Sequence, residues 1–202
     1  MPGCAGTIAS FNWDTSTTAV AATQYHLSSQ YYDICIRRAR KYCSICYSPQ
    51  SGFPAIAGAA ASYGVSAGSV DATQTSAIGS DCTGVNVLNP AAAPGTATDN
   101  VGKGDYLDIV ALQASTGTKG ALNTNRICGV LFNAAAAQTT HTTACSWAVP
   151  FKVGVHFDDA DSIVPAADAA TAMASGENDV QAVSAAGLGY SGFHLAYWQN
   201  SC

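Results

Sequence analysis

The sequence predicts an all-β domain, and three observations lead to this prediction. Short segments in which apolar and polar residues alternate recur along the chain, as in strands that bury one face. Loops of Gly, Ala, Ser and Thr separate these segments. Charged residues are only 10% of the 202 residues, so solubility depends on small polar side chains. This balance is typical of extracellular β proteins.

The clearest strand is predicted at residues 151–157, where four apolar residues at alternate positions form a core face: Phe151, Val153, Val155 and Phe157. A strand at 193–199 repeats the pattern, and in one at 105–111 Leu107 and Ile109 are expected to point inward and Tyr106 and Asp108 outward. Further strands are predicted at residues 7–12, 31–37, 42–47 and 126–132.

Long segments of small residues lie between these strands, at 52–80, 85–102 and 158–189. The last contains the only helical signal, at residues 165–173, where Pro165 suits the first turn of a short surface helix. Loops of this length are usually functional, held by disulfides or packed against a neighbour. No repeat or linker divides the chain, so residues 1–202 are predicted to form a single domain.

The cysteines predict disulfides and an oxidising compartment, because their number is even and they are widely spread: Cys4, Cys35, Cys43, Cys46, Cys82, Cys128, Cys145 and Cys202. Cys43 and Cys46 have the spacing of half a zinc site, but the second half is missing. Three residues apart on a strand, they face opposite sides and are expected to have different partners.

Charge and hydropathy exclude two classes of partner. A net charge of −5 with eight Lys and Arg residues argues against nucleic acid, and the basic run at residues 37–41 is interpreted as a solvated strand end or turn. The sequence has no uninterrupted stretch of about 18 apolar residues, so no membrane span is predicted. Since residues 1–4 do not resemble a signal peptide, we expect a secreted protein in its mature form.

Two strings resemble catalytic motifs without the context that their chemistry needs. The Gly-x-Ser-x-Gly string around Ser66 requires a strand-turn-helix in an α/β sheet. The Gly-x-Gly-x-x-Gly string ending at Gly192 precedes a strand instead of following one, and is interpreted as a turn. His156 and His194 are interpreted as surface histidines, although they could meet on adjacent strands and bind a metal. We therefore expect no catalytic residues and no enzyme.

Asp158, Asp159 and Asp161 begin a loop directly after a predicted core strand. Clustered carboxylates repel one another unless a cation or solvent screens them. Calcium takes six to eight oxygen ligands, but the spacing is not that of an EF-hand. A calcium site and a solvated loop both remain open from these residues.

Five short pieces in order along the chain resemble the CUB domain, an extracellular sandwich of two antiparallel β-sheets. They are Gly6-Thr7-Ile8-x-Ser10, Asp105-Tyr106-Leu107-Asp108-Ile109, Arg126-Ile127-Cys128-Gly129, Phe157-Asp158-Asp159 and the segment at 192–197. The segments at 34–38, 42–47 and 197–202 look closer to the CUB-like secreted proteins of insects and crustaceans. The resemblance implies a CUB-like sandwich with long loop insertions.

The resemblance also implies two disulfides, Cys4–Cys35 and Cys82–Cys128, and leaves open how Cys43, Cys46, Cys145 and Cys202 pair. Many CUB domains bind calcium through a Glu and two Asp residues. Asp105 matches the first Asp and Asp158 or Asp159 the second, but no Glu lies between Cys46 and Cys82. The candidate calcium ligands are Asp105, Asp158, Asp159 and Asp161.

These observations predict a non-catalytic extracellular module that is structural or adhesive and associates with itself, an extracellular matrix or a filament. Low charge leaves little repulsion between copies. The alternative is a calcium-assisted recognition module for a glycan or a basic protein segment. In that case Trp13, Tyr106 and Trp198 are the exposed aromatic residues expected to stack on sugar rings.

Overall fold

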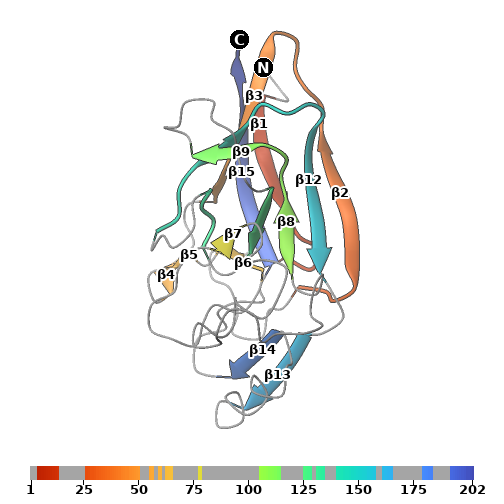
Figure 1. Cartoon of the computed structure of the whole chain (residues 1–202), viewed down its shortest axis with the longest axis vertical. Coiled ribbons are helices and arrows are strands. Elements are labelled where there is room, and N and C mark those ends of the chain that lie inside the picture. Colours follow the sequence, from red (N-terminus) through yellow and green to blue (C-terminus); the bar gives the residue numbers. More distant parts are fainter. Residues whose placement is uncertain are drawn as a thin grey trace, which may run out of the picture.

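The computed structural model describes residues 4–13, 26–50, 55–56, 59–60, 62–65, 77–78, 105–114, 125–128, 131–134, 140–157, 161–165, 179–183 and 192–202. Within these ranges every regular element is a strand, and two antiparallel sheets form a sandwich (Figure 1). The predicted fold class is therefore confirmed.

The six-stranded sheet follows the order β1, β15, β3, β11 and β9, with β6 also paired to β15. Its strands are β1 (Ala5–Ala9), β15 (Gly192–Ser201), β3 (Tyr42–Pro49), β11 (Ala144–Ser146), β9 (Leu112–Ala114) and β6 (Tyr63–Gly64). Strand β1 lies at the edge of this sheet and pairs with β15.

The five-stranded sheet has the order β2, β12, β8, β10 and β7. Its strands are β2 (Gln30–Ile36), β12 (Phe151–Phe157), β8 (Tyr106–Asp108), β10 (Arg126–Cys128) and β7 (Ala77–Ile78). Two small two-stranded sheets complete the described part. In one, β4 (Ala55–Ile56) pairs with β5 (Ala59–Ala60) in antiparallel orientation. In the other, β13 (Asp161–Pro165) pairs with β14 (Asp179–Val183) in parallel orientation. Strand β2 is the edge that pairs with β12.

The core lies between the two large sheets, and the predicted inward residues fill it. The four alternating residues of β12 are at most 1% exposed, while Lys152 and His156 between them are partly exposed. Residues from the facing sheet close the core, namely Ile45, Tyr47, Phe193 and Leu195. Burial of such side chains stabilises the fold by about 1.5–3 kcal/mol each.

Two predicted strands are shorter than expected. The strand predicted at 105–111 is β8, which ends at Asp108, and a turn with Ala111 at φ 56° separates it from β9. The strand predicted at 126–132 ends at Cys128. The predicted surface helix does not begin at Pro165, because this residue is the last of β13. Residues 166–173 lie outside the described part.

Two of the three aromatic residues predicted to be exposed are buried. Trp13 is 8% exposed and Tyr106 is 9% exposed. Tyr106 is covered because the His156 ring stacks on it at 4.5 Å and the Arg126 guanidinium lies 4.5 Å from its centroid. Only Trp198 of the three is partly exposed, so the prediction was wrong for Trp13 and Tyr106.

Two disulfides join strands of the six-stranded sheet, Cys43–Cys202 and Cys46–Cys145. Cys43 and Cys46 thus have different partners, as their spacing predicts. Cys128 is also disulfide-bonded, to a partner outside the described residues; Cys82 lies there too, and their pairing stays a prediction.

The predicted Cys4–Cys35 disulfide is absent, and both cysteines are free thiols in the structure. Cys35 lies between Ile34 and Ile36 on β2, and these two pack against the core while Cys35 faces away from it and is exposed. Cys4 precedes β1 in the other sheet, beside Tyr42. The alternation of β2 therefore directs the Cys35 thiol outward, and the pairing implied by the resemblance is corrected.

Acidification is expected to destabilise the fold through His141. Its Nδ1 accepts a hydrogen bond from the backbone N–H of Phe132 at 3.0 Å, and burial lowers its pKa to about 4. An unfolded chain takes up this proton near pH 6.5, so the stabilisation is present above that pH and lost as pH falls through 4. Because the ring is partly exposed, we expect a loss of about 2 kcal/mol between pH 7 and pH 4.

Urea unfolding of the disulfide-bonded protein across this pH range measures the effect. The His141→Gln variant should show a pH dependence smaller by the same amount, since glutamine does not titrate. The same pH dependence in both proteins would contradict the assignment to His141.

Candidate binding surface along strands β1 and β2

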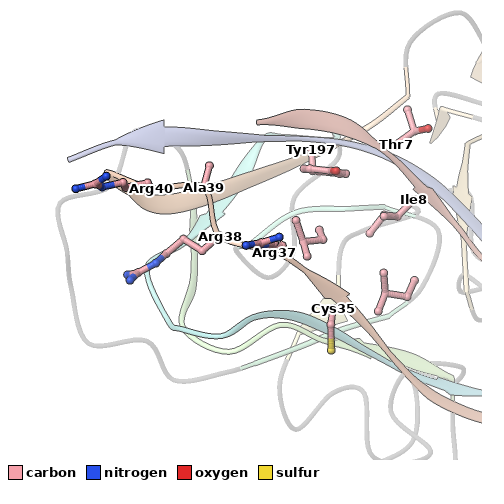
Figure 2. A pocket seen from close by; sticks show the side chains of 10 residues that line it. Thr7, Ile8, Cys35, Arg37, Arg38, Ala39, Arg40 and Tyr197 are labelled. Carbon is pink, nitrogen blue, oxygen red and sulfur yellow. The ribbon is translucent and has the colours of Figure 1, made fainter. Parts of the chain in front are cut away.

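The edge strands β1 and β2 belong to different sheets but lie on the same side of the sandwich, with a groove of about 670 Å³ between them (Figure 2). The groove is lined by Thr7, Ile8, Ile34, Cys35, Ile36, Arg37, Arg38, Ala39, Arg40 and Tyr197. The arginines lie at one end, and Thr7 and Ile8 at the other. This surface has an apolar part and a cationic part.

The apolar part of the groove continues the core of the sandwich. Ile8, Ile34, Ile36 and Tyr197 are partly buried and pack against the core cluster. The Tyr197 ring lies against Gly6, where an added Cβ would come within 2.9 Å of the Tyr197 hydroxyl. Gly6 therefore lets the ring of Tyr197 lie across β1. These partly buried apolar side chains line the groove between the two edges.

Within the described part of the chain, the backbone of β1 presents groups along this edge that have no hydrogen-bond partner. The carbonyl of Cys4 accepts from Gln199 N–H at 2.7 Å, and Ser10 N–H donates to the Phe193 carbonyl at 2.9 Å. In an antiparallel ladder alternate residues bond to the same neighbour, so Ala5, Thr7 and Ala9 direct their N–H and C=O groups away from β15. The sequence of β1 has no charged residue and no proline, which commonly protect edges.

The cationic end of the groove is a turn held in place by Gln199. Its side chain accepts from Ala39 N–H at 2.8 Å and donates to the Arg37 carbonyl at 3.0 Å. Arg37, Arg38 and Arg40 are exposed, and among the described residues none of them forms an ion pair. With Lys41 they are four of the eight Lys and Arg residues. The sequence predicts the solvated turn but not the groove that it borders.

Exposed apolar side chains lie at the other end of the two strands. Phe11 follows β1 and is 57% exposed, while Leu27 and Tyr31 near the start of β2 are 46% and 65% exposed. Phe11 contacts Tyr32, with ring centroids 4.6 Å apart, which joins the two strands. We call Phe11, Leu27 and Tyr31 the apolar patch. Exposed apolar side chains thus lie near one end of β1 and β2, and the groove with its arginines lies along the rest of these strands.

Of the four candidate calcium ligands, the structure describes the side chain of Asp105 alone. Asp158 and Asp159 lie outside the described residues, and Asp161 is the first residue of β13. Asp105 is 1% exposed, and its Oδ2 lies 2.9 Å from Nε2 of His26. A cation bound by Asp105 must compete with His26 for this oxygen, so the described donors do not by themselves form a calcium site. Calcium binding stays a prediction that depends on the other three aspartates.

Sequence reasoning missed His26, whose ring stacks on Phe157 with centroids 4.0 Å apart. His26 and Asp105 lie far apart in the sequence, and no local motif indicates this contact. Gly192 is required here: it has φ 86°, and a Cβ on it would collide with the side chain of Ser10 and lie 3.3 Å from the Cβ of His26. Gly192 is the first residue of β15 and pairs with Gly64, while the rest of the string interpreted as a turn, residues 187–191, lies outside the described residues.

The other candidate sites are not assembled in the described part. His156 and His194 lie in different sheets, on β12 and β15, and do not meet. His156 packs between the rings of Tyr31 and Tyr106, and burial lowers its pKa. Ser66 lies outside the described residues. No group of three or more His, Cys, Asp or Glu that could hold a metal is present within those that are described.

The family model of the animal CUB domain matches residues 2–200. The chain belongs to the CUB domain family. Members of this family are generally non-catalytic binding modules that mediate protein interactions, and the sandwich and the disulfides agree with an extracellular CUB domain. No curated protein and no solved structure matches the chain. The closer resemblance to arthropod proteins stays a prediction, and so does a single domain over residues 1–202.

No helix in the described ranges of this CUB domain is long and apolar enough to cross a membrane. The disulfide between Cys46 and Cys145, which are 3% and 4% exposed, links two strands of the six-stranded sheet. The edge strand of this sheet, β1, forms one side of the groove. The features that position the groove are therefore the two edge strands, the turn after β2 and the core beneath Tyr197.

Proposed function

We propose that this CUB domain is a secreted, non-catalytic structural or adhesive module that associates with itself, an extracellular matrix or a filament. The observation that carries the proposal is the side of the sandwich along β1 and β2. There the apolar patch lies near one end of the two strands, and the groove, the open backbone edge and the arginine cluster lie along the rest of them. Each of these features favours contact with another macromolecule.

Physical chemistry supports association at this side. Phe11 and Tyr31 are more than half exposed, and aromatic side chains contribute most to protein interfaces when a partner buries them. The unpaired groups of β1 can pair with a strand of another chain. A chain with only 10% charged residues has little electrostatic repulsion to oppose such contacts.

The alternative proposal is calcium-assisted recognition of a glycan or a basic segment. Two of its three predicted aromatic residues, Trp13 and Tyr106, are buried, and Asp105 is paired with His26. Self-association does not depend on these residues. We therefore place it first.

Light scattering coupled to size exclusion tests the proposal. The molar mass of the purified protein should rise with concentration, in EDTA as well as in calcium. The Phe11→Ser/Tyr31→Ser variant should weaken association roughly tenfold, since two exposed aromatic anchors are lost. Val110→Ser is the matched control, because Val110 is 44% exposed and lies outside the apolar patch. A strict monomer at millimolar concentration would contradict self-association.

A further inference from the structure

The basic turn after β2 is held beside the start of β1. The backbone N–H of Gln199 on β15 donates to the carbonyl of Cys4, directly before β1, at 2.7 Å. The side chain of the same glutamine accepts from Ala39 N–H at 2.8 Å and donates to the Arg37 carbonyl at 3.0 Å. Gln199 is 6% exposed, so a buried side chain fixes the position of the turn. The arginines are therefore held at the end of the groove where β1 begins (Figure 2).

The positive charge of this turn is not compensated within the described part of the chain. Arg37, Arg38 and Arg40 are exposed, and none of them forms an ion pair with a described residue. Asp33 is the acidic residue nearest to them in sequence, but its carboxylate lies 3.2 Å from Nζ of Lys152 instead. A guanidinium group binds a carboxylate through two parallel hydrogen bonds. Several carboxylates on one ligand therefore complement this end of the groove.

The edge of β1 complements an extended polypeptide. Ala5, Thr7 and Ala9 direct their N–H and C=O groups away from β15, and no described group pairs with them. The strand has five residues and spans about 17 Å. A segment of similar length can extend the sheet by one strand, and its main-chain hydrogen bonds then contribute to affinity.

The apolar part of the groove favours a peptide over a glycan. A strand that pairs with β1 directs every second side chain to the same face as Ile8. Apolar side chains at these positions cover Ile8, Ile34 and Ile36, which are partly buried and line the groove. A sulfated glycan complements the arginines, but it offers neither a backbone for the strand edge nor apolar side chains for the isoleucines.

We propose that the groove binds an extended acidic segment of another extracellular protein, which pairs with β1 and places its carboxylates against Arg37, Arg38 and Arg40. This inference rests on the proposed function, since it names the chemistry of the partner with which the module associates. The segment has apolar residues at alternate positions along β1 and acidic residues where it reaches the start of this strand. Its charges give direction to the contact, and its backbone and apolar side chains give contact area.

A synthetic peptide serves as the probe. In its sequence Val and Thr alternate over six positions and three Glu residues follow, with fluorescein at the amino end and an amide at the carboxyl end. Measured by fluorescence anisotropy, the peptide should bind the disulfide-bonded protein, and a peptide with Lys in place of Glu should not. Affinity should fall as salt rises from about 0.01 M to about 1 M, because the screening length falls from about 30 Å to about 3 Å.

Variants of the protein test the arginines. Arg38→Gln/Arg40→Gln removes two exposed guanidinium groups and should weaken binding of the peptide at least about tenfold. Arg126→Gln is the matched control, because it removes an arginine from β10, which β12 and β8 separate from β2 in the sheet. It should change the affinity by less than about twofold. Far-ultraviolet circular dichroism verifies that both variants are folded.

Methylated peptides test the pairing with β1 without any change to the protein. N-methylation of the Thr positions and of the Val positions gives two peptides that lose the same number of N–H donors. In a strand, alternate residues direct their N–H groups to opposite sides, so only one of the two sets faces β1. One methylated peptide should therefore bind at least about tenfold more weakly than the other. Equal affinities of the two would overturn the pairing with this edge.

The outcomes separate this inference from the proposed function. Failure of the acidic peptide to bind, or equal binding to the unmodified protein and to Arg38→Gln/Arg40→Gln, would overturn the inference, and oligomers in light scattering would then leave the proposed function standing. A strict monomer that binds the peptide would support the inference and contradict self-association alone. A monomer that binds no peptide would overturn both. A sulfated hexasaccharide that binds more tightly than the peptide, with the same dependence on the arginines, would overturn the inference in favour of a glycan.

Discussion

The His26→Ala variant is expected to lose about 4 kcal/mol of unfolding free energy. Nε2 of His26 lies 2.9 Å from Oδ2 of Asp105, and both side chains are fully buried. Removal of the imidazole takes this partner away from a carboxylate that has no access to bulk water. The free energy lost in this way is far larger than the net contribution of the pair to stability. The cavity left beside Phe157, on which the ring stacks, adds to this loss.

Chemical denaturation of the four proteins of a double-mutant cycle measures this effect. Because Asp105→Ala removes the carboxylate that loses its His26 contact in His26→Ala, the double variant should be more stable than the sum of the two losses predicts. His156→Ala is the control, since His156 is a partly exposed histidine on the outer face of β12. Equal losses in His26→Ala and His156→Ala would contradict the buried pair.

The same cycle bears on calcium. If millimolar calcium raises the melting temperature of His26→Ala but not of the unmodified protein, then Asp105 can act as a ligand once the histidine is absent. If calcium raises the melting temperature of both, His26 does not block a site that the other aspartates complete. We expect that calcium does not raise the melting temperature of the unmodified protein through Asp105.

The sequence predicts those parts of the fold that depend on local alternation. Residues 151–157 alternate in hydropathy because one face is buried, and they form β12 with the expected bounds. The end of β8 was not predicted, because it depends on the left-handed conformation of Ala111, a residue that rarely adopts it. The burial of Tyr106 was also missed, since His156 and Arg126 cover it from neighbouring strands.

The candidate surface depends on contacts between distant segments, which a local pattern does not contain. The basic run at residues 37–41 is visible in the sequence, but it borders a groove only because β1 belongs to the facing sheet. The contact between His26 and Asp105 arises in the same way. The resemblance to the CUB family located Asp105 and implied the Cys4–Cys35 disulfide, whereas both cysteines are free thiols in the structure.

The Cys46→Ala/Cys145→Ala variant is expected to lose about 4–5 kcal/mol, because the disulfide closes a loop of 99 residues and so restricts the unfolded chain. Its cysteines are register partners on β3 and β11, and removal of the buried sulfurs also leaves a small cavity. The Cys43→Ala/Cys202→Ala variant is the matched control. Its loop of 159 residues gives a similar entropic term, but Cys202 is exposed and directly follows the end of β15, where local opening needs no global unfolding. Urea unfolding should therefore show the larger loss for Cys46→Ala/Cys145→Ala, and equal losses would indicate that loop entropy alone determines the contribution of both bonds.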